Sequence, residues 1–211
     1  FLTVATPGAG KTTYALRLAS ELLDRRVVER IVVVAPTEHL KTQWAEAAKK
    51  VGIPLDPEFS GSKGTTSSDY LGIAVTYAGV AASTLLFLRR VEDRKTLVIL
   101  DEVHHAGDSL SWGESVREAF EPATRRLALT GTPFRSDINP IPFVTYVPGS
   151  DGIPRSAADT SYGYGDALRD NVVRPVMFLA YSGRMRWRTR AGDEVSAVLG
   201  ADQAKDVTQQ A

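Results

Sequence analysis

The stretch that most constrains the fold is Ala-Thr-Pro-Gly-Ala-Gly-Lys-Thr at residues 5–12. An apolar run, Phe1 to Ala5, precedes it, and an amphipathic run from Thr13 to Asp24 follows it. This order predicts a strand, a glycine-rich loop and a helix. The spacing is that of a phosphate-binding loop, with Ala5 where the general pattern has its first glycine. We call residues 5–12 the predicted phosphate loop.

The residue types of this loop suit a triphosphate. Such a ligand needs several converging N–H donors, and a loop without bulky side chains lets backbone amides curve around it. Gly8 and Gly10 give the backbone that freedom, and the following helix adds the positive end of its dipole. The Lys11 ammonium can reach the β- and γ-phosphates, and the Thr12 hydroxyl can bind Mg²⁺. The alternative, a glycine turn that happens to carry Lys-Thr, does not explain the strand–loop–helix context.

Further strand candidates alternate with helix candidates up to about residue 135. The runs Ile31–Ala35 and Thr96–Leu100 are continuously apolar, which is typical of strands buried on both faces of a parallel sheet. Further strands are expected at Ile73–Tyr77 and Leu127–Thr130. Helices are expected at 37–51, with Trp44 in its apolar stripe, at 78–90, and at 111–120, where Ser111 and Glu114 form a capping box. Residues 54–69 are rich in Gly, Ser, Thr and Pro and predict a loop. We therefore predict an α/β fold with a central, mostly parallel sheet and helices on both faces. Ligands of such sheets bind beyond the carboxyl ends of the strands.

Two acids, Asp101 and Glu102, follow the apolar strand at 96–100. A carboxylate pair at such a strand end, after a phosphate loop, is typical of the second half of a nucleotide site. Asp101 would hold Mg²⁺, and Glu102 is placed to polarise the attacking water as a general base. The alternative is two solvated turn acids.

Composition narrows the class of protein. The chain has 25 basic and 25 acidic residues, so any basic surface has to be local, and without cysteine it has neither disulfides nor thiolate metal sites. No apolar run reaches the ~18 residues of a membrane span and no signal peptide is visible. We expect a cytoplasmic protein without a membrane partner. Because Phe1 already lies within the first strand, we also expect a fragment of something longer.

Four ordered motifs resemble the first RecA-like domain of superfamily 2 helicases and translocases, of the DEAD/DEAH-box and type III restriction subunit group. They are the predicted phosphate loop, Val-Ala-Pro-Thr at 34–37, Asp-Glu-Val-His-His at 101–105 and Leu-Thr-Gly-Thr-Pro-Phe-Arg at 129–135. The resemblance implies a P-loop NTPase that uses ATP and Mg²⁺. The implied ATP contacts are Thr6, Pro7, Gly8, Ala9, Gly10, Lys11, Thr12 and Thr13, with Thr12 and Asp101 on Mg²⁺ and with Lys11, Asp101 and Glu102 catalytic.

The same resemblance implies residues outside the ATP site. Nucleic-acid contacts are expected at Pro36, Thr37, Leu40, Thr76 and Tyr77, and His104, Thr130 and Thr132 would couple the two sites. DNA is expected rather than RNA, by analogy with repair and restriction relatives.

Plainer interpretations of several of these residues stay open. Thr37 is a favoured helix N-cap whether or not it also contacts a phosphate. Thr130 and Thr132 can simply close a turn, and His104 with His105 could suggest a metal site, although only one other histidine exists. The alternation of arginine at 184–190 predicts a strand with one basic face, which is either a nucleic-acid ridge or a solvated edge.

Residues 1–150 are predicted to form the ATP-binding domain, and 151–211 a linker and strand extension toward a second RecA-like domain that this chain does not contain. Within the extension we expect a strand at Val176–Tyr181. The resemblance implies a helicase or translocase that hydrolyses ATP to move along or unwind DNA. The alternatives are a translocase of a restriction or defence complex that does not unwind, and a nucleotide-binding interaction module without motor activity.

Overall fold

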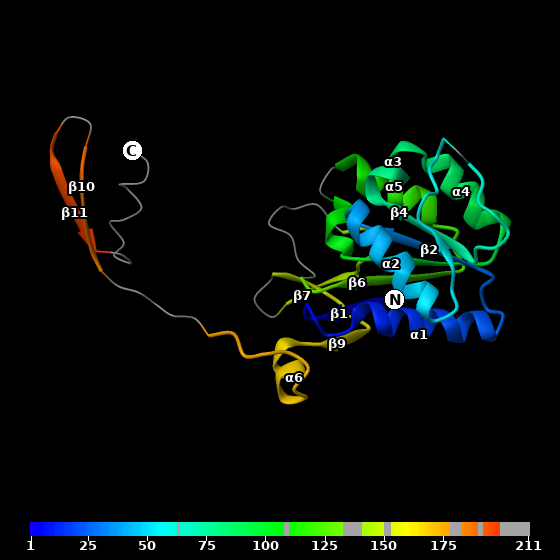
Figure 1. Ribbon diagram of the computed structural model, residues 1–211, viewed down its shortest axis with the longest axis horizontal. Coiled ribbons are helices and arrows are strands. Elements are labelled where there is room, and N and C mark those ends of the chain that lie inside the picture. Colours follow the sequence, from blue (N-terminus) through cyan, green and yellow to red (C-terminus); the bar gives the residue numbers. More distant parts are fainter. Residues whose placement is uncertain are drawn as a thin grey trace. The chain divides into compact units, whose positions relative to one another are not determined.

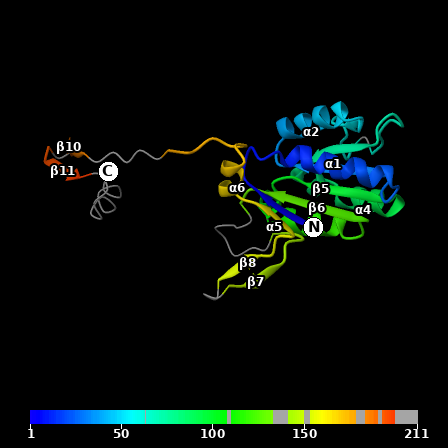
Figure 2. The ribbon, with the colours of Figure 1, turned by 90° about the horizontal axis from the view of Figure 1, so that it is seen from below.

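The computed structural model describes residues 1–62, 64–107, 110–132, 141–149, 153–177, 183–189 and 192–198. They belong to two compact units, Phe1–Val173 and Arg174–Ala211. The first unit contains the central sheet and is drawn with its helices in Figures 1 and 2. Within the described residues, no helix combines the length and the apolar character needed to cross a membrane.

The first unit is built on a seven-stranded sheet in the order β3-β4-β2-β5-β6-β1-β9, in which every neighbouring pair is parallel. Its strands are β1 (Leu2–Ala5), β2 (Arg30–Ala35), β3 (Leu55–Asp56), β4 (Gly72–Thr76), β5 (Thr96–Leu100), β6 (Arg125–Thr130) and β9 (Thr160–Tyr162). Because all the strands run the same way, the ends of β1, β2, β4, β5 and β6 lie at one edge of the sheet. The predicted fold class is confirmed.

Helices cover both faces of this sheet, as Figure 2 shows. The helices of the first unit are α1 (Lys11–Asp24), α2 (Glu38–Lys50), α3 (Tyr77–Ala82), α4 (Thr84–Asp93), α5 (Leu110–Phe120) and α6 (Tyr164–Arg169), and the 3-10 helix η1 (Val103–Gly107) lies between β5 and α5. The side chains of β2 alternate between the faces. Ile31 and Val33 pack with residues of α1 and α2, whereas Val32 and Val34 pack with residues of α3, α4 and α5.

Three local predictions differ from the structure. The single helix expected at 78–90 is two helices, because Ser83 departs from helical geometry with φ −147°. The loop carrying Gly61 lies directly against this break, where a Cβ on Gly61 would stand 1.9 Å from Ser83 Oγ. The loop expected at 54–69 contains the two-residue strand β3, whose Leu55 is buried. Helix α5 begins at Leu110, so Ser111 is not its N-cap as the sequence predicted.

The first compact unit continues to Val173, so it includes part of the segment that the sequence assigned to the extension. Strand β9 pairs with β1 through Thr3 and Thr160, and Thr6 N donates to Tyr162 O over 3.1 Å. Without β9, strand β1 would present unpaired backbone groups at the edge of the sheet. Strands β7 (Tyr146–Pro148) and β8 (Pro154–Ser156) form a separate antiparallel hairpin.

The described part of the second unit contains one antiparallel hairpin, β10 (Arg184–Arg188) with β11 (Glu194–Val198). Strand β10 was predicted from its arginine alternation, although Arg190 lies outside the described residues. Strand β11 was not predicted. Of the strand expected at 176–181, residues 176 and 177 have no regular structure, and the rest lies outside the described residues.

Candidate functional site

The predicted phosphate loop connects β1 to α1 at the carboxyl edge of the sheet. Gly8 and Gly10 have φ of 80° and 84°, in the left-handed region that glycine adopts at little cost. Gly10 is the N-cap of α1, and no side chain caps that helix. The first N–H groups of α1 therefore have no capping side chain, which is the arrangement that binds an anion at a helix N-terminus.

Lys11 lies at the start of α1 and turns its side chain toward the end of β5. Its Nζ atom is 3.0 Å from Oε1 of Glu102, and it also donates to the carbonyl oxygen of Ala5 over 3.3 Å. The two side chains of the ion pair are 11% and 25% exposed. The structure therefore brings together the predicted phosphate-binding lysine and the predicted general base.

Glu102 occupies a sharp turn after β5. Its φ is 45°, in the left-handed region where a residue with a Cβ is disfavoured by about 1–2 kcal/mol. Contacts on both carboxylate oxygens oppose this strain, since Oε1 pairs with Lys11 and Oε2 accepts from the Gly131 N–H over 3.2 Å. Strained residues of this kind cluster at functional sites.

Asp101 is the most buried acid of the site, at 8% exposure. Its Oδ2 atom accepts a hydrogen bond of 2.7 Å from Nε1 of Trp44. Burial raises the pKa of the Asp101 carboxyl, the hydrogen bond from Trp44 opposes that shift, and the charge of Glu102 adds to it. The Thr12 hydroxyl and the Asp101 carboxylate are both hard oxygen donors, so this pair fits Mg²⁺, which takes few protein ligands beside phosphates and water.

Three residues predicted to couple the two sites lie at the end of β6 and beside it. His104 Nδ1 is 2.9 Å from Thr130 Oγ1, which also accepts from the Thr132 N–H over 3.1 Å. His104 Nδ1 also lies 3.6 Å from Glu102 Oε2. Thr130 is fully buried, so its hydroxyl is held in this network rather than in solvent. No group of three or more metal-ligating His, Cys, Asp or Glu side chains occurs in the described part of the chain.

The residues expected to contact nucleic acid follow β2 and β4. Thr37 caps α2 by accepting from the Leu40 N–H over 3.3 Å, and Thr76 caps α3 by accepting from the Gly79 N–H over 3.1 Å. Thr37 is exposed, and Pro36, Leu40 and Thr76 are half-buried. Tyr77 is different: it is fully buried and its hydroxyl donates to the Asp101 carbonyl oxygen over 2.9 Å, so its side chain lies in the core instead of on the surface.

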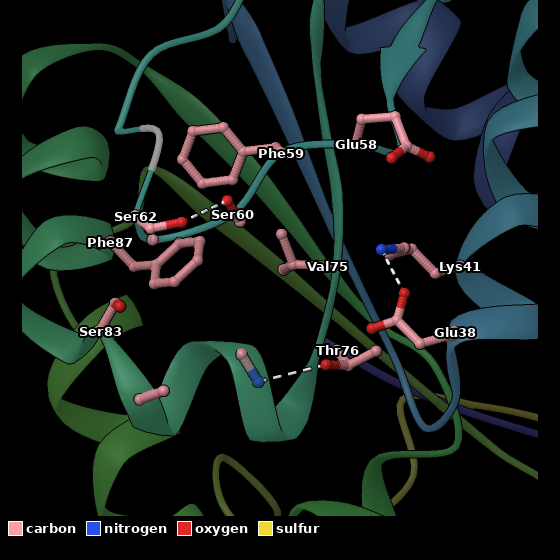
Figure 3. A pocket seen from close by; sticks show the side chains of 13 residues that line it. Glu38, Lys41, Glu58, Phe59, Ser60, Ser62, Val75, Thr76, Ser83 and Phe87 are labelled. Carbon is pink, nitrogen blue, oxygen red and sulfur yellow. Dashed lines mark hydrogen bonds and ion pairs between the residues drawn. The ribbon is translucent and has the colours of Figure 1, made fainter.

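A pocket of about 490 Å³ lies between the starts of α2 and α3 (Figure 3). Its wall includes the ion-paired Glu38 and Lys41 of α2, Thr76 at the start of α3, and Ser60 and Ser62 of the preceding loop. The two serine hydroxyls are 3.0 Å apart. The sequence predicted only a loop rich in Gly, Ser and Thr here, because nothing in its pattern indicates which helices it contacts.

The hydrogen bond between Trp44 and Asp101 was not predicted from the sequence. Trp44 was assigned to the apolar stripe of α2, and its side chain is indeed buried. The tryptophan itself indicates such a bond, because a buried indole N–H normally needs a hydrogen-bond acceptor. A tryptophan on the helix after β2 could therefore have been expected to contact a polar group near the strand ends.

Comparisons with known proteins agree with this architecture. The sequence pattern of the family described as type III restriction enzyme, res subunit, matches residues 1–135. An uncharacterized protein of Mycobacterium tuberculosis is 59% identical over all 211 residues, which cover 35% of that relative. The helicase domain of Pyrococcus furiosus Hef is 26% identical, with a TM-score of 0.51 over 64% of this chain and 30% of that one.

A second solved structure is more distant. The type ISP restriction-modification enzyme LlaGI, in complex with a DNA substrate mimic, is 15% identical, with a TM-score of 0.53 over 81% of this chain and 18% of that one. This likeness shows the shared fold. The chain spans about a third of the length of the curated mycobacterial relative that it matches.

Proposed function

The chain belongs to the type III restriction enzyme res subunit family, which is helicase-like, and we propose that it is the N-terminal ATPase lobe of a motor that hydrolyses ATP to move along or unwind DNA. One observation carries this proposal. Lys11 pairs with Glu102, and the adjacent Asp101 is held by its own hydrogen bond, at the strand ends where ligands of parallel α/β sheets bind.

Each residue of the site has its own role in the proposed reaction. Lys11 would neutralise charge that develops on the γ-phosphate oxygens, and the amides of the predicted phosphate loop would bind the other phosphates. Thr12 and Asp101 would hold Mg²⁺, which would neutralise phosphate charge. Glu102 would orient the attacking water and accept its proton. For Glu102 to act in this way, the Lys11 ammonium has to leave the Glu102 carboxylate and bind phosphate oxygens instead.

The network beyond Glu102 supports a coupling role for His104, Thr130 and Thr132. Gly131 N donates to the same carboxylate, so a shift of the segment after β6 would move the proposed general base. A buried hydroxyl shared between a ring nitrogen and a backbone N–H gives this connection a defined geometry.

The helix caps Thr37 and Thr76, with Pro36 and Leu40, are the proposed nucleic-acid contacts. A hydroxyl or N–H at a helix start can bind a phosphate oxygen, which positions a strand without reading its sequence. The restriction-enzyme name of the family supports DNA as the polymer. The family name equally favours a second candidate, a DNA translocase of a restriction complex that does not unwind its track.

We further propose that the intact protein carries a second RecA-like domain. The mycobacterial relative extends well beyond the matched region, which leaves room for such a domain. An arginine supplied across the cleft would raise turnover by orders of magnitude. The described lobe alone would then bind ATP weakly and hydrolyse it slowly.

Steady-state ATPase activity of the full-length protein tests the proposal. It is measured without nucleic acid and with single-stranded DNA, duplex DNA and RNA in turn, and Lys11→Ala is the blank. We expect stimulation by DNA that Lys11→Ala abolishes. Stimulation by RNA alone would replace DNA as the track, and turnover that no polymer stimulates would favour the interaction module. Strand-displacement and triplex-displacement assays then separate unwinding from translocation.

A further inference from the structure

Two buried aromatic side chains donate hydrogen bonds to Asp101. Trp44 Nε1 donates to the carboxylate oxygen Oδ2 over 2.7 Å, and the Tyr77 hydroxyl donates to the backbone carbonyl oxygen over 2.9 Å. Trp44 is 2% exposed and Tyr77 is fully buried. A hydrogen bond is stronger in the low-dielectric interior than at the surface, so these two bonds fix the position of Asp101 more firmly than surface contacts would.

The two donors come from two different helices. Trp44 lies in the middle of α2, whose N-cap is Thr37, and Tyr77 is the first residue of α3, whose N-cap is Thr76. A third bond, from Asp101 N to Val34 O over 2.9 Å, joins the same residue to the end of β2. The predicted Mg²⁺ ligand is therefore bonded to each of the two helices that begin at the proposed nucleic-acid contacts.

An apolar side chain at residue 44 could pack in the stripe formed with Ala45 and Ala48 but could not bind Asp101, so an apolar stripe alone does not require an indole. The N–H group matters because a buried carboxylate is unfavourable unless it is hydrogen-bonded. A donor on Oδ2 also limits rotation of the carboxylate, and groups that orient a metal ligand in this way strongly affect metal affinity.

We propose that Trp44 is a positioning residue for the metal: its indole N–H holds the Asp101 carboxylate in the orientation that binds Mg²⁺ and links that carboxylate to α2. Tyr77 holds the backbone of the same residue from α3. This inference rests on the proposed function, because it requires Asp101 to bind the Mg²⁺ that accompanies a nucleotide. It adds a residue outside the predicted site and a physical connection from the Mg²⁺ ligand to the helix capped by Thr37.

The indole N–H resonances of the ¹⁵N-labelled chain provide the test. The three tryptophans, Trp44, Trp112 and Trp187, are assigned by substituting each with phenylalanine. A non-hydrolysable ATP analogue is then titrated with Mg²⁺ and, separately, with EDTA. We expect the Trp44 resonance to shift with Mg²⁺ and analogue together and to move far less in EDTA. The backbone amides of Gly8 and Gly10 report nucleotide binding in both arms.

Two tryptophan variants test the same inference through the affinity for Mg²⁺. Trp44→Phe keeps an aromatic ring but removes the donor, and we expect it to weaken Mg²⁺ binding in the presence of the analogue by about 10-fold or more. Its affinity for the analogue in EDTA should stay unchanged, a split that a general loss of packing would not produce. Trp112→Phe is the matched control, because Trp112 packs against the core on the other face of the sheet.

The outcomes separate the two proposals. If the Gly8 and Gly10 amides respond while the Trp44 resonance stays still, the inference is overturned and the ATP site stands. Equal Mg²⁺ affinities for Trp44→Phe and Trp112→Phe would overturn it in the same way. If neither the amides nor the indole respond at saturating analogue and Mg²⁺, both proposals fail. Should Trp44→Phe not fold, the Trp112→Phe and Trp187→Phe variants assign the Trp44 resonance by elimination, and its response in the unsubstituted chain still decides.

Discussion

The Nζ atom of Lys11 lies 3.0 Å from Oε1 of Glu102, so the predicted phosphate-binding lysine and the predicted general base are ion-paired with each other. A γ-phosphate would compete with Glu102 for the same ammonium group. The second carboxylate oxygen accepts from Gly131 N, a contact that does not involve Lys11 and would hold Glu102 near the strand ends if Lys11 moved away. In the proposed function, the pair would therefore link nucleotide binding to release of the proposed general base.

Glu102→Gln should separate binding from turnover. The amide cannot accept the proton of the attacking water, so turnover is expected to fall by about 10²- to 10⁴-fold. Nucleotide affinity should stay the same or tighten, because Lys11 no longer leaves an anionic partner. Single-turnover hydrolysis and binding of a fluorescent ATP analogue measure the two quantities. Glu46→Gln, at an exposed position of α2, is the control, and undiminished turnover in Glu102→Gln would refute the assigned role.

The same isosteric change on two adjacent strands should have opposite effects on stability. Thr130→Val removes a buried hydroxyl that is bonded to His104 and Thr132, and leaving these partners unsatisfied should lower the free energy of unfolding by about 1–3 kcal/mol. Thr3 Oγ1 is buried with no hydrogen-bond partner among the described residues. Thr3→Val should therefore be neutral or stabilising by up to about 1 kcal/mol.

Urea unfolding curves of the two valine variants measure this contrast. The positions are close, since Val4 pairs with Thr130 and Thr3 with Leu129, so general effects of a valine in these strands are matched. A destabilised Thr3→Val variant would mean that its hydroxyl has a bonding partner after all. A neutral Thr130→Val variant would contradict the role of this hydroxyl in the network beside Glu102.

Much of this architecture follows from local patterns in the sequence. The apolar runs that became β2 and β5 are buried on both faces because each lies inside a parallel sheet, and Ile31, Val32, Val33 and Val34 have almost no exposed surface. The glycines of the predicted phosphate loop have the positive φ values that their positions require. These features depend on spacing along the chain, which a single sequence displays directly.

The rest depends on contacts between distant residues. The bond between Trp44 and Asp101 joins residues 57 positions apart, and the pairing of Thr3 with Thr160 joins the first strand to a segment expected beyond the domain boundary. Tyr77 looked like a surface contact because it follows a strand end, but its ring turns into the core and bonds to Asp101. No periodicity in the sequence indicates which way such a side chain turns.

At Gly72, strands β2 and β4 lie so close together that no residue with a side chain should fit. A Cβ at this position would lie 1.9 Å from the carbonyl oxygen of Ile31, a backbone atom that cannot move aside. Gly72→Ala should destabilise the chain by about 3 kcal/mol or more, at the upper end for overpacking. Gly165→Ala is the control, because nothing lies within 4 Å of its Cβ and the change removes a glycine from α6.

Thermal unfolding of both glycine variants decides this point. The control should be neutral or stabilised by about 0.5–1 kcal/mol, since alanine is the better helix former. If Gly72→Ala unfolded at the temperature of the unsubstituted chain, β2 and β4 would have to lie farther apart than the register between Ile31 and Gly72 implies.

Thr37 can be tested as a cap and as a nucleic-acid contact independently. Aspartate is at least as good an N-cap as threonine, and a negative charge at the start of α2 is favourable for the helix dipole. Thr37→Asp should therefore leave stability unchanged or slightly raised, while its charge repels a phosphate and weakens DNA binding by about 10-fold at low salt. Thr37→Ser should retain both properties, and Thr37→Ala should lose about 1 kcal/mol of stability. Fluorescence anisotropy with a labelled duplex measures the affinities of the full-length protein. If Thr37→Asp binds DNA as tightly as Thr37→Ser, the residue is only a helix cap, and the DNA path has to be sought elsewhere on the carboxyl edge of the sheet.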